Sequence, residues 1–146
     1  MQVLEAEYKN ELTAGLEAPV PDFRAGDYLR LTLDDGSTPR PESAKVLVIG
    51  RSHRGPRSSF TVLRGHGEEV WRETYPLYCP EIRRIEVIGT MPRRPRQAKL
   101  HRLWRDQPTV LQLGLDAKSD EKQAMALKGR ERRQAKREAR ASQAAR

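Results

Sequence analysis

Hydrophobic and polar residues alternate with a period of two through the middle of the chain. In FRAGDYLRLTL, residues 23–33, Leu29, Leu31 and Leu33 face one way in an extended strand and the residues between them face the other. Further runs rich in Val, Ile, Thr and aromatic residues occupy residues 45–49, 59–63, 69–75, 82–88 and 97–104, separated by loops that contain Gly or Pro. These six short strands predict a mainly β protein, folded as an antiparallel barrel or sandwich. A closed barrel would leave no exposed strand edge.

The N-terminal segment follows a helical pattern instead. Apolar residues lie at helical spacing at Val3, Leu4, Tyr8 and Leu12, and Gly15 and two later prolines end the pattern. We therefore expect a short amphipathic helix over residues 3–14. A loosely ordered extension is the alternative that this pattern leaves open.

The C-terminal segment, residues 117–146, consists mostly of helix-forming Ala, Lys, Arg, Glu and Gln. Met125 and Leu127 are its only large apolar residues, so we expect packing not to be what holds this helix. The expected organisation is an N-terminal extension (1–19), a β domain (20–105), a linker (106–116) and a basic helical tail (117–146).

Charge is divided unevenly between the two parts of the chain. Residues 1–90 carry 12 Lys and Arg against 14 Asp and Glu, whereas residues 91–146 carry 16 against 6. Apolar residues make up 36% of the sequence, below the roughly 45–50% of globular proteins. A small domain followed by a basic arm fits both observations, and basic arms commonly bind the phosphates of nucleic acids.

The sequence lacks the patterns of most enzymes and metal sites. Cys79 is the only cysteine, which excludes an intramolecular disulfide and a site of paired thiolates. The segment GRSHRGPR has Pro56 and Arg57 where a phosphate-binding loop needs Lys and Ser or Thr. The histidines are scattered, and no serine lies in a nucleophile motif. We expect no enzymatic activity, no metal, no cofactor and no small-molecule substrate.

No apolar run approaches the roughly 20 residues that cross a bilayer. The first residues, MQVLEAEYKNEL, are too acidic for a secretory signal or an Arg-rich transit peptide. We therefore expect a protein without a membrane partner.

A basic loop joins the runs 45–49 and 59–63. It carries Arg51, His53, Arg54 and Arg57, and Gly55 gives its backbone the freedom to approach a phosphate chain. Arginine binds phosphate in a bidentate way and stacks on exposed bases. The loop is interpreted as an RNA-binding loop; a solvated basic loop is the structural alternative.

Four segments also resemble, in order and at similar spacing, the bacterial-type large-subunit ribosomal protein nineteen family. They are VPDFRAGDYLRLTL, KVLVIGRSHRGPRSSFTVLR, ETYPLYCPEIRRIEVI and RRPRQAKLHRL, which together span residues 20–105. The resemblance implies an SH3-like barrel that binds large-subunit ribosomal RNA near the subunit interface. It also implies neighbouring large-subunit proteins and a bridging contact with small-subunit RNA as partners.

The family's RNA-facing loop corresponds to Arg51, Arg54, Gly55, Arg57 and Ser59, and its basic strand to Arg94, Arg96, Lys99 and Arg102. The complete set of residues expected to contact RNA adds His53 and Arg64, Arg93 and Arg105, and, in the tail, Lys128, Arg130, Arg132, Arg133, Lys136, Arg137 and Arg140.

After residue 103 the sequence departs from the family pattern, because DQPTVLQLGL replaces an expected basic segment. This divergence and the added tail favour a mitochondrial ribosome over a plastid or bacterial one. The expected function is that of a structural constituent of the large subunit in translation. A freestanding RNA-binding regulator or chaperone on the same fold is the alternative.

Overall fold

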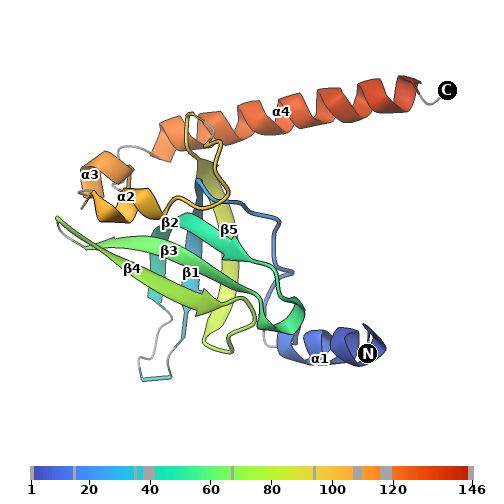
Figure 1. Cartoon of the computed structure of the whole chain (residues 1–146), viewed down its shortest axis with the longest axis vertical. Coiled ribbons are helices and arrows are strands. Elements are labelled where there is room, and N and C mark those ends of the chain that lie inside the picture. Colours follow the sequence, from blue (N-terminus) through green and yellow to red (C-terminus); the bar gives the residue numbers. More distant parts are fainter. Residues whose placement is uncertain are drawn as a thin grey trace.

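A five-stranded antiparallel sheet forms the centre of the computed structural model (Figure 1). The structure describes residues 2–14, 16–34, 36–37, 42–66, 68–93, 95–106, 110–115 and 120–144. The strands are β1 (Asp27–Leu33), β2 (Glu42–Ser52), β3 (Ser59–His66), β4 (Glu69–Pro76) and β5 (Ile82–Thr90). The helices are α1 (Gln2–Thr13), the 3-10 turn η1 (Gly55–Arg57), α2 (His101–Arg105), α3 (Val110–Leu113) and α4 (Asp120–Ala144). None of the described helices is long and apolar enough to span a membrane.

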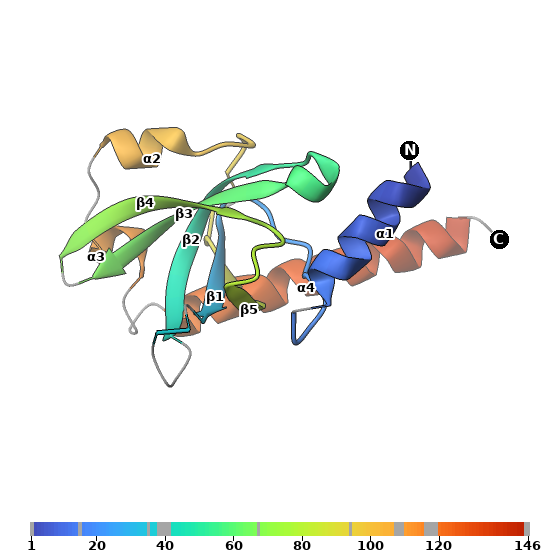
Figure 2. The same cartoon turned by 90° about the horizontal axis from the view of Figure 1, so that it is seen from below.

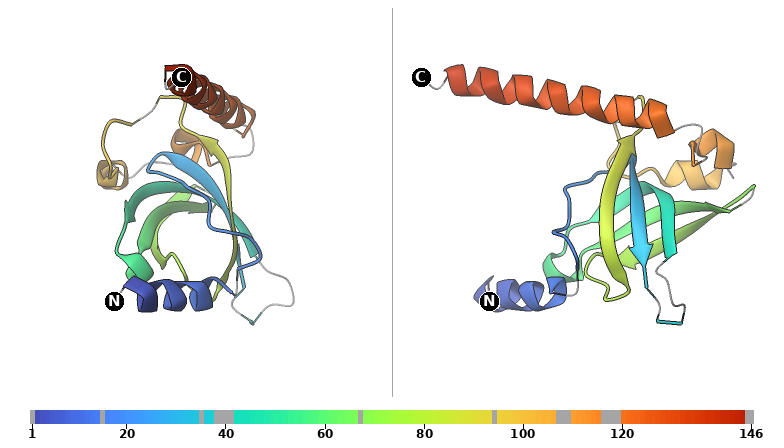
Figure 3. Two further views of the ribbon diagram at one scale, coloured as in Figure 1. Left: turned by 90° about the vertical axis from the view of Figure 1, so that its right-hand side faces the viewer. Right: turned by 180° about the vertical axis from the view of Figure 1, so that it is seen from behind.

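The mainly β fold with a helix at each end is confirmed, but the expected closed barrel is wrong. The strand order is β4-β3-β2-β1-β5, so β4 and β5 are edges of a strongly curved, open sheet (Figure 3, left). Charged side chains lie along both edges. β4 exposes Glu69 and Arg72, and β5 exposes Arg83 and Arg84, which disfavour pairing with another chain. The helix α4 crosses only the end of β5 near Gly89 (Figure 1).

Apolar side chains are buried on both faces of the sheet, as β2 shows most clearly. Val46 and Val48 belong to one core cluster, while Leu47 and Ile49 belong to a second cluster on the opposite face. All four are 1% exposed or less. The continuous apolar run 46–49 is therefore the signature of a central strand covered on both sides.

The side-chain alternation expected for β1 is confirmed, and the side chains of β3 alternate in the same way. Leu29 and Leu31 lie in the first cluster, and so do Phe60 and Val62 of β3. Leu63 lies in the second cluster. The aromatic rings of Phe23 and Phe60 meet edge to face in the first cluster, with centroids 5.4 Å apart. Such a pair adds about 0.5–1.5 kcal/mol beyond its area burial.

The strand expected over residues 97–104 is wrong, because α2 (His101–Arg105) begins within it. Leu100, Leu103 and Trp104 all pack on the second cluster, and their spacing of three and four is helical rather than alternating. The Leu100 amide donates to the Ile49 carbonyl at 2.6 Å, which ties this segment to β2.

The segment expected as a linker carries a helical turn, α3 (Val110–Leu113). Leu113 is 5% exposed and its carbonyl accepts a hydrogen bond of 2.6 Å from the Tyr28 hydroxyl. Residues 107–109 and 116 of the expected linker, and residues 38–41 of the expected loop before β2, lie outside the described residues.

The expected tail helix is confirmed over Asp120–Ala144, but the expectation that packing does not hold it is wrong for its first turns. Gln123 is 3% exposed and lies against Gly89 of β5, whereas Met125 is 76% exposed. From residue 131 to residue 143 every side chain is exposed. The views in Figure 1 and Figure 3 (right) both show this part of α4 projecting beyond the sheet.

The expected N-terminal helix is confirmed as α1, which lies beside η1 (Figure 2). It lies at the end of the sheet opposite to α4 (Figure 1). Its apolar residues Val3, Leu4 and Tyr8 are 70%, 67% and 53% exposed. The helical spacing therefore predicted the element correctly but not a buried face.

Candidate nucleic-acid interface

The basic loop after β2 is a rigid turn rather than an open strand connection. Gly55 has φ +57°, and a Cβ there would meet no atom within 4 Å, so glycine is required by the backbone and not by space. The buried Ser58 hydroxyl donates to the Gly55 carbonyl at 2.7 Å and accepts from the Arg54 amide at 3.1 Å. This turn holds the exposed side chains of Arg54 and Arg57 outward.

Two arginines expected to contact RNA also interact with other parts of the protein. Arg51 has a side chain 15% exposed; its guanidinium lies 4.5 Å from the Phe23 ring centroid and donates to the Phe23 carbonyl at 3.1 Å. Arg64 forms an ion pair with Glu42 across the sheet. These contacts tie β2 and β3 to neighbouring segments.

A groove with a volume of about 890 Å³ lies between α4, the segment that follows β5, and the segment that leads into β1. It is lined by six arginines and one aspartate, namely Arg24, Arg51, Arg96, Arg130, Arg133 and Arg137, with Asp27. Its remaining walls include His53 and the apolar residues Phe23, Met91, Pro92, Pro95 and Met125. The groove thus brings together residues that were expected to contact RNA from three separate parts of the chain.

An ion pair joins α4 to the start of β1 at this groove. The guanidinium of Arg130 lies 2.7 Å from a carboxylate oxygen of Asp27, and Asp27 is 2% exposed. The second oxygen of Asp27 accepts a hydrogen bond of 2.8 Å from the Arg24 amide. Both oxygens of the buried carboxylate are therefore satisfied, as burial of a charge requires.

Close backbone approach completes the attachment of α4. A Cβ at Gly89 would lie 2.6 Å from the Cβ of Gln123, a distance that real side chains do not adopt. The amide of Gln123 donates to the Gly114 carbonyl at 2.6 Å. The absence of a side chain at position 89 lets the helix rest directly on β5.

The remaining residues expected to contact RNA lie outside the η1 turn and the groove. Ser59 is half-buried in β3 and pairs with Ser52. Outside the groove, four residues expected to contact RNA have exposed side chains on the segment after β5 and on α2, namely Arg93, Lys99, Arg102 and Arg105. Four more are exposed on α4 outside the groove, namely Lys128, Arg132, Lys136 and Arg140. Arg94 lies outside the described residues.

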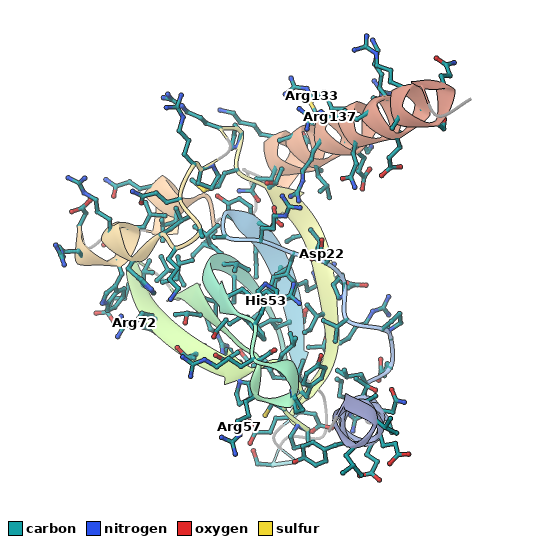
Figure 4. All side chains as sticks on the ribbon, turned by 45° about the vertical axis from the view of Figure 1, so that its right-hand side comes forward. Asp22, His53, Arg57, Arg72, Arg133 and Arg137 are labelled. Carbon is teal, nitrogen blue, oxygen red and sulfur yellow. The ribbon has the colours of Figure 1, made fainter. Side chains whose placement is uncertain are left out.

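Two groups of positive side chains lie at opposite ends of the sheet (Figure 4). Arg57 lies at one end of the sheet, while Arg133 and Arg137 lie on α4 at the other. His53 leaves the same loop as Arg57 but lines the groove with the second group.

Sequence reasoning missed Asp27, Gly89 and Gln123. For Gly89 a signal was present, because a glycine inside a strand often marks the close approach of another segment. Asp27 and Arg130 are 103 positions apart, and no local pattern connects them.

Within the described part of the chain, no group of three or more His, Cys, Asp or Glu residues could hold a metal ion. Cys79 is a half-buried free thiol beside the first core cluster. The fold and its surface define a small antiparallel β protein with two basic groups of side chains.

The chain belongs to the ribosomal protein L19 family. The family model described as Ribosomal protein L19 matches residues 4–109, which include all five strands and α2. Membership assigns the chain a structural role in the large ribosomal subunit and in translation. All of α4, with its basic residues, lies after the matched range.

Proposed function

We propose that the protein binds large-subunit ribosomal RNA through its two basic groups and does no chemistry. The observation that carries the proposal is the convergence of Arg96, Arg133 and Arg137 on one groove from segments far apart in the sequence. Such a gathering of like charges costs electrostatic free energy in the free protein. Phosphate chains would remove that cost by replacing like-charge repulsion with attraction.

The family membership supports a place in the ribosome rather than a freestanding regulator. Family resemblance further favours a position near the subunit interface, with neighbouring large-subunit proteins and small-subunit RNA as partners. The compartment expected from the divergent C-terminal part is mitochondrial, with plastid and bacterial cytoplasm as the alternatives.

Sedimentation of the tagged full chain tests the proposal. The protein should migrate with large subunits and stay with them in high salt, because many phosphate contacts act together within a folded assembly. Release into the top fractions at moderate salt, with binding to many unrelated RNAs, would favour the freestanding regulator instead.

A truncation after Arg130 separates the role of the projecting helix from that of the fold. It retains Gln123 and Arg130, which attach α4, and removes residues whose described side chains are all exposed. We expect the melting temperature to be nearly unchanged and incorporation into large subunits to fall. Normal incorporation of this truncated chain would show that the projecting part of α4 takes no part in binding.

A further inference from the structure

The groove beside α4 differs from an ordinary basic surface patch in being concave and partly apolar. Arginines line it on several sides, while Met91, Pro92 and Pro95 form part of one wall. Pro95 is fixed there by Gly26: a Cβ at Gly26, which has φ +93°, would lie 2.8 Å from the Pro95 ring. The wall is therefore a built feature of the fold rather than a loose loop.

The charges of the groove are not all neutralised by the protein. Arg130 pairs with Asp27, and Arg51 lies near Asp22 at 3.4 Å. Among the described residues, no ion pair is formed by the remaining four arginines of the groove, which are Arg24, Arg96, Arg133 and Arg137. These four guanidinium groups are available to an anionic ligand.

Shape decides which form of RNA fits this site. A duplex presents its phosphates on a convex surface and offers proteins a wide, shallow minor groove. A concave site with a volume of about 890 Å³ instead suits a single strand, whose backbone follows a positive groove while its bases stack on planar groups. The guanidinium planes and the exposed imidazole of His53 supply such planar groups here.

We infer that this groove is a binding site for an unpaired segment of RNA. Arg133 and Arg137 hold the phosphates from the α4 side, Arg96 holds them from the opposite wall, and His53 or a guanidinium stacks on a base. The inference rests on the proposed function, since it specifies the form of RNA that one of the two basic groups takes. The η1 turn, where the side chains of Arg54 and Arg57 are exposed, is left to contact duplex backbone.

Two pairs of substitutions in the full-length protein test the inference by charge. The groove pair is Arg133→Gln with Arg137→Gln, and the matched control is Arg132→Gln with Lys136→Gln on the same helix outside the groove. Both remove two positive charges. Affinity is measured by fluorescence anisotropy for a labelled oligouridine and for an RNA hairpin with the same number of phosphates, over a range of salt concentrations.

For oligouridine, we measure the slope of the logarithm of the binding constant against the logarithm of the salt concentration. The groove pair should reduce the magnitude of this slope by about 1.4, since each phosphate that is no longer bound lowers it by roughly 0.7. The control pair should change the slope much less. Equal losses of affinity for both pairs would overturn the inference that the groove is the binding site. The proposal that the basic surface binds RNA would still stand. Wild-type protein that binds neither RNA would overturn the proposed function itself.

A steric test requires no change of charge. Gly129 lines the groove, and a Cβ there meets no atom within 4 Å, so a larger side chain enters the open space without a clash at its root. Gly129→Trp should weaken oligouridine binding about fivefold or more, by excluding a stacked base, and leave hairpin binding unchanged. Gly129→Ala, the control, should bind oligouridine as the wild type does. Full oligouridine affinity in Gly129→Trp, with its melting temperature preserved, would contradict a strand lying in the groove.

Discussion

The sheet and α4 are held in place by different forces. The sheet buries apolar side chains on both faces, with Phe60, Val62 and Leu63 each 1% exposed or less. In α4 the one side chain that the structure describes as buried is the polar Gln123. The helix is fixed by its close approach to Gly89, by the hydrogen bond from Gln123 to the Gly114 carbonyl and by one ion pair. We therefore expect the sheet to keep its fold when the projecting, exposed part of α4 is weakened or removed.

The largest effect is expected from the core of the sheet. Phe60→Ala should lower the free energy of unfolding by about 3–5 kcal/mol, because it removes a buried ring and leaves a cavity. In a domain this small that loss approaches the total stability. Thr61→Ala, a substitution in the same strand that removes only a hydrogen bond to Thr74, should cost about 1 kcal/mol or less. Urea denaturation measures both, and a Phe60→Ala protein with the wild-type midpoint would contradict the assigned core.

A smaller effect is expected where α4 meets the sheet. Gly89→Ala places a Cβ 2.6 Å from that of Gln123, so the helix must shift at a cost of about 1–3 kcal/mol. Limited trypsin digestion should then cleave α4 faster, because its arginines are less often held against the fold. The control Gly129→Ala has open space at its Cβ and should stabilise the helix by up to about 1 kcal/mol. Equal protection of α4 in Gly89→Ala and wild type would show that the close contact does not hold the helix.

High pH should lower the stability of the sheet through Tyr75, which lies in β4. Burial, and next the hydrogen bond to Glu73, raise the pKa of Tyr75 to about 12. The ionised phenol is thus disfavoured more in the folded than in the unfolded state. The stability that this difference provides is complete below the unfolded pKa near 10 and is lost as pH rises from there through about 12.

The variant Tyr75→Phe isolates this contribution. Its free energy of unfolding should fall less steeply between pH 10 and pH 12 than that of the wild type. Chemical denaturation at a series of pH values measures the slope. Identical slopes for the two proteins would remove Tyr75 as the cause.

The smallest effect on stability is expected at the η1 turn. Arg54→Ala with Arg57→Ala removes exposed charges that contribute little to folding, so the melting temperature should hardly change. Affinity for ribosomal RNA fragments should fall, and the salt slope should decrease by roughly 0.7–0.9 for each phosphate that is no longer bound. Unchanged RNA binding by this double variant would exclude the turn from the interface.

Much of the sheet could be predicted from its sequence because each strand carries its own pattern. The alternation around Leu29 and Leu31 and the continuous run of β2 are local signals, and both correspond to observed burial. The segment 97–104 was misassigned as a strand, although the spacing of Leu100, Leu103 and Trp104 already favoured a helix. Barrel closure was predicted from the need to protect strand edges, but the two edge strands carry exposed charged residues instead.

The groove could not be predicted in this way. Its composition was visible, since Arg96, Arg133 and Arg137 were all expected to contact RNA. Their convergence depends on Gly89 and on the pair of Asp27 with Arg130, which join residues far apart in the chain. Charge counting cannot reveal such contacts, because it treats each basic segment as a separate arm.

Hydrogen–deuterium exchange of the full chain, free and bound to large-subunit ribosomal RNA, tests the central claim that an anchored helix presents its basic residues to RNA. In the free protein, amides of residues 121–130 should exchange more slowly than those of residues 131–143, because tertiary contacts hold only the first part. Addition of RNA should slow exchange through residues 131–143. Exchange in α4 that is uniform along the helix and unchanged by RNA would contradict the account.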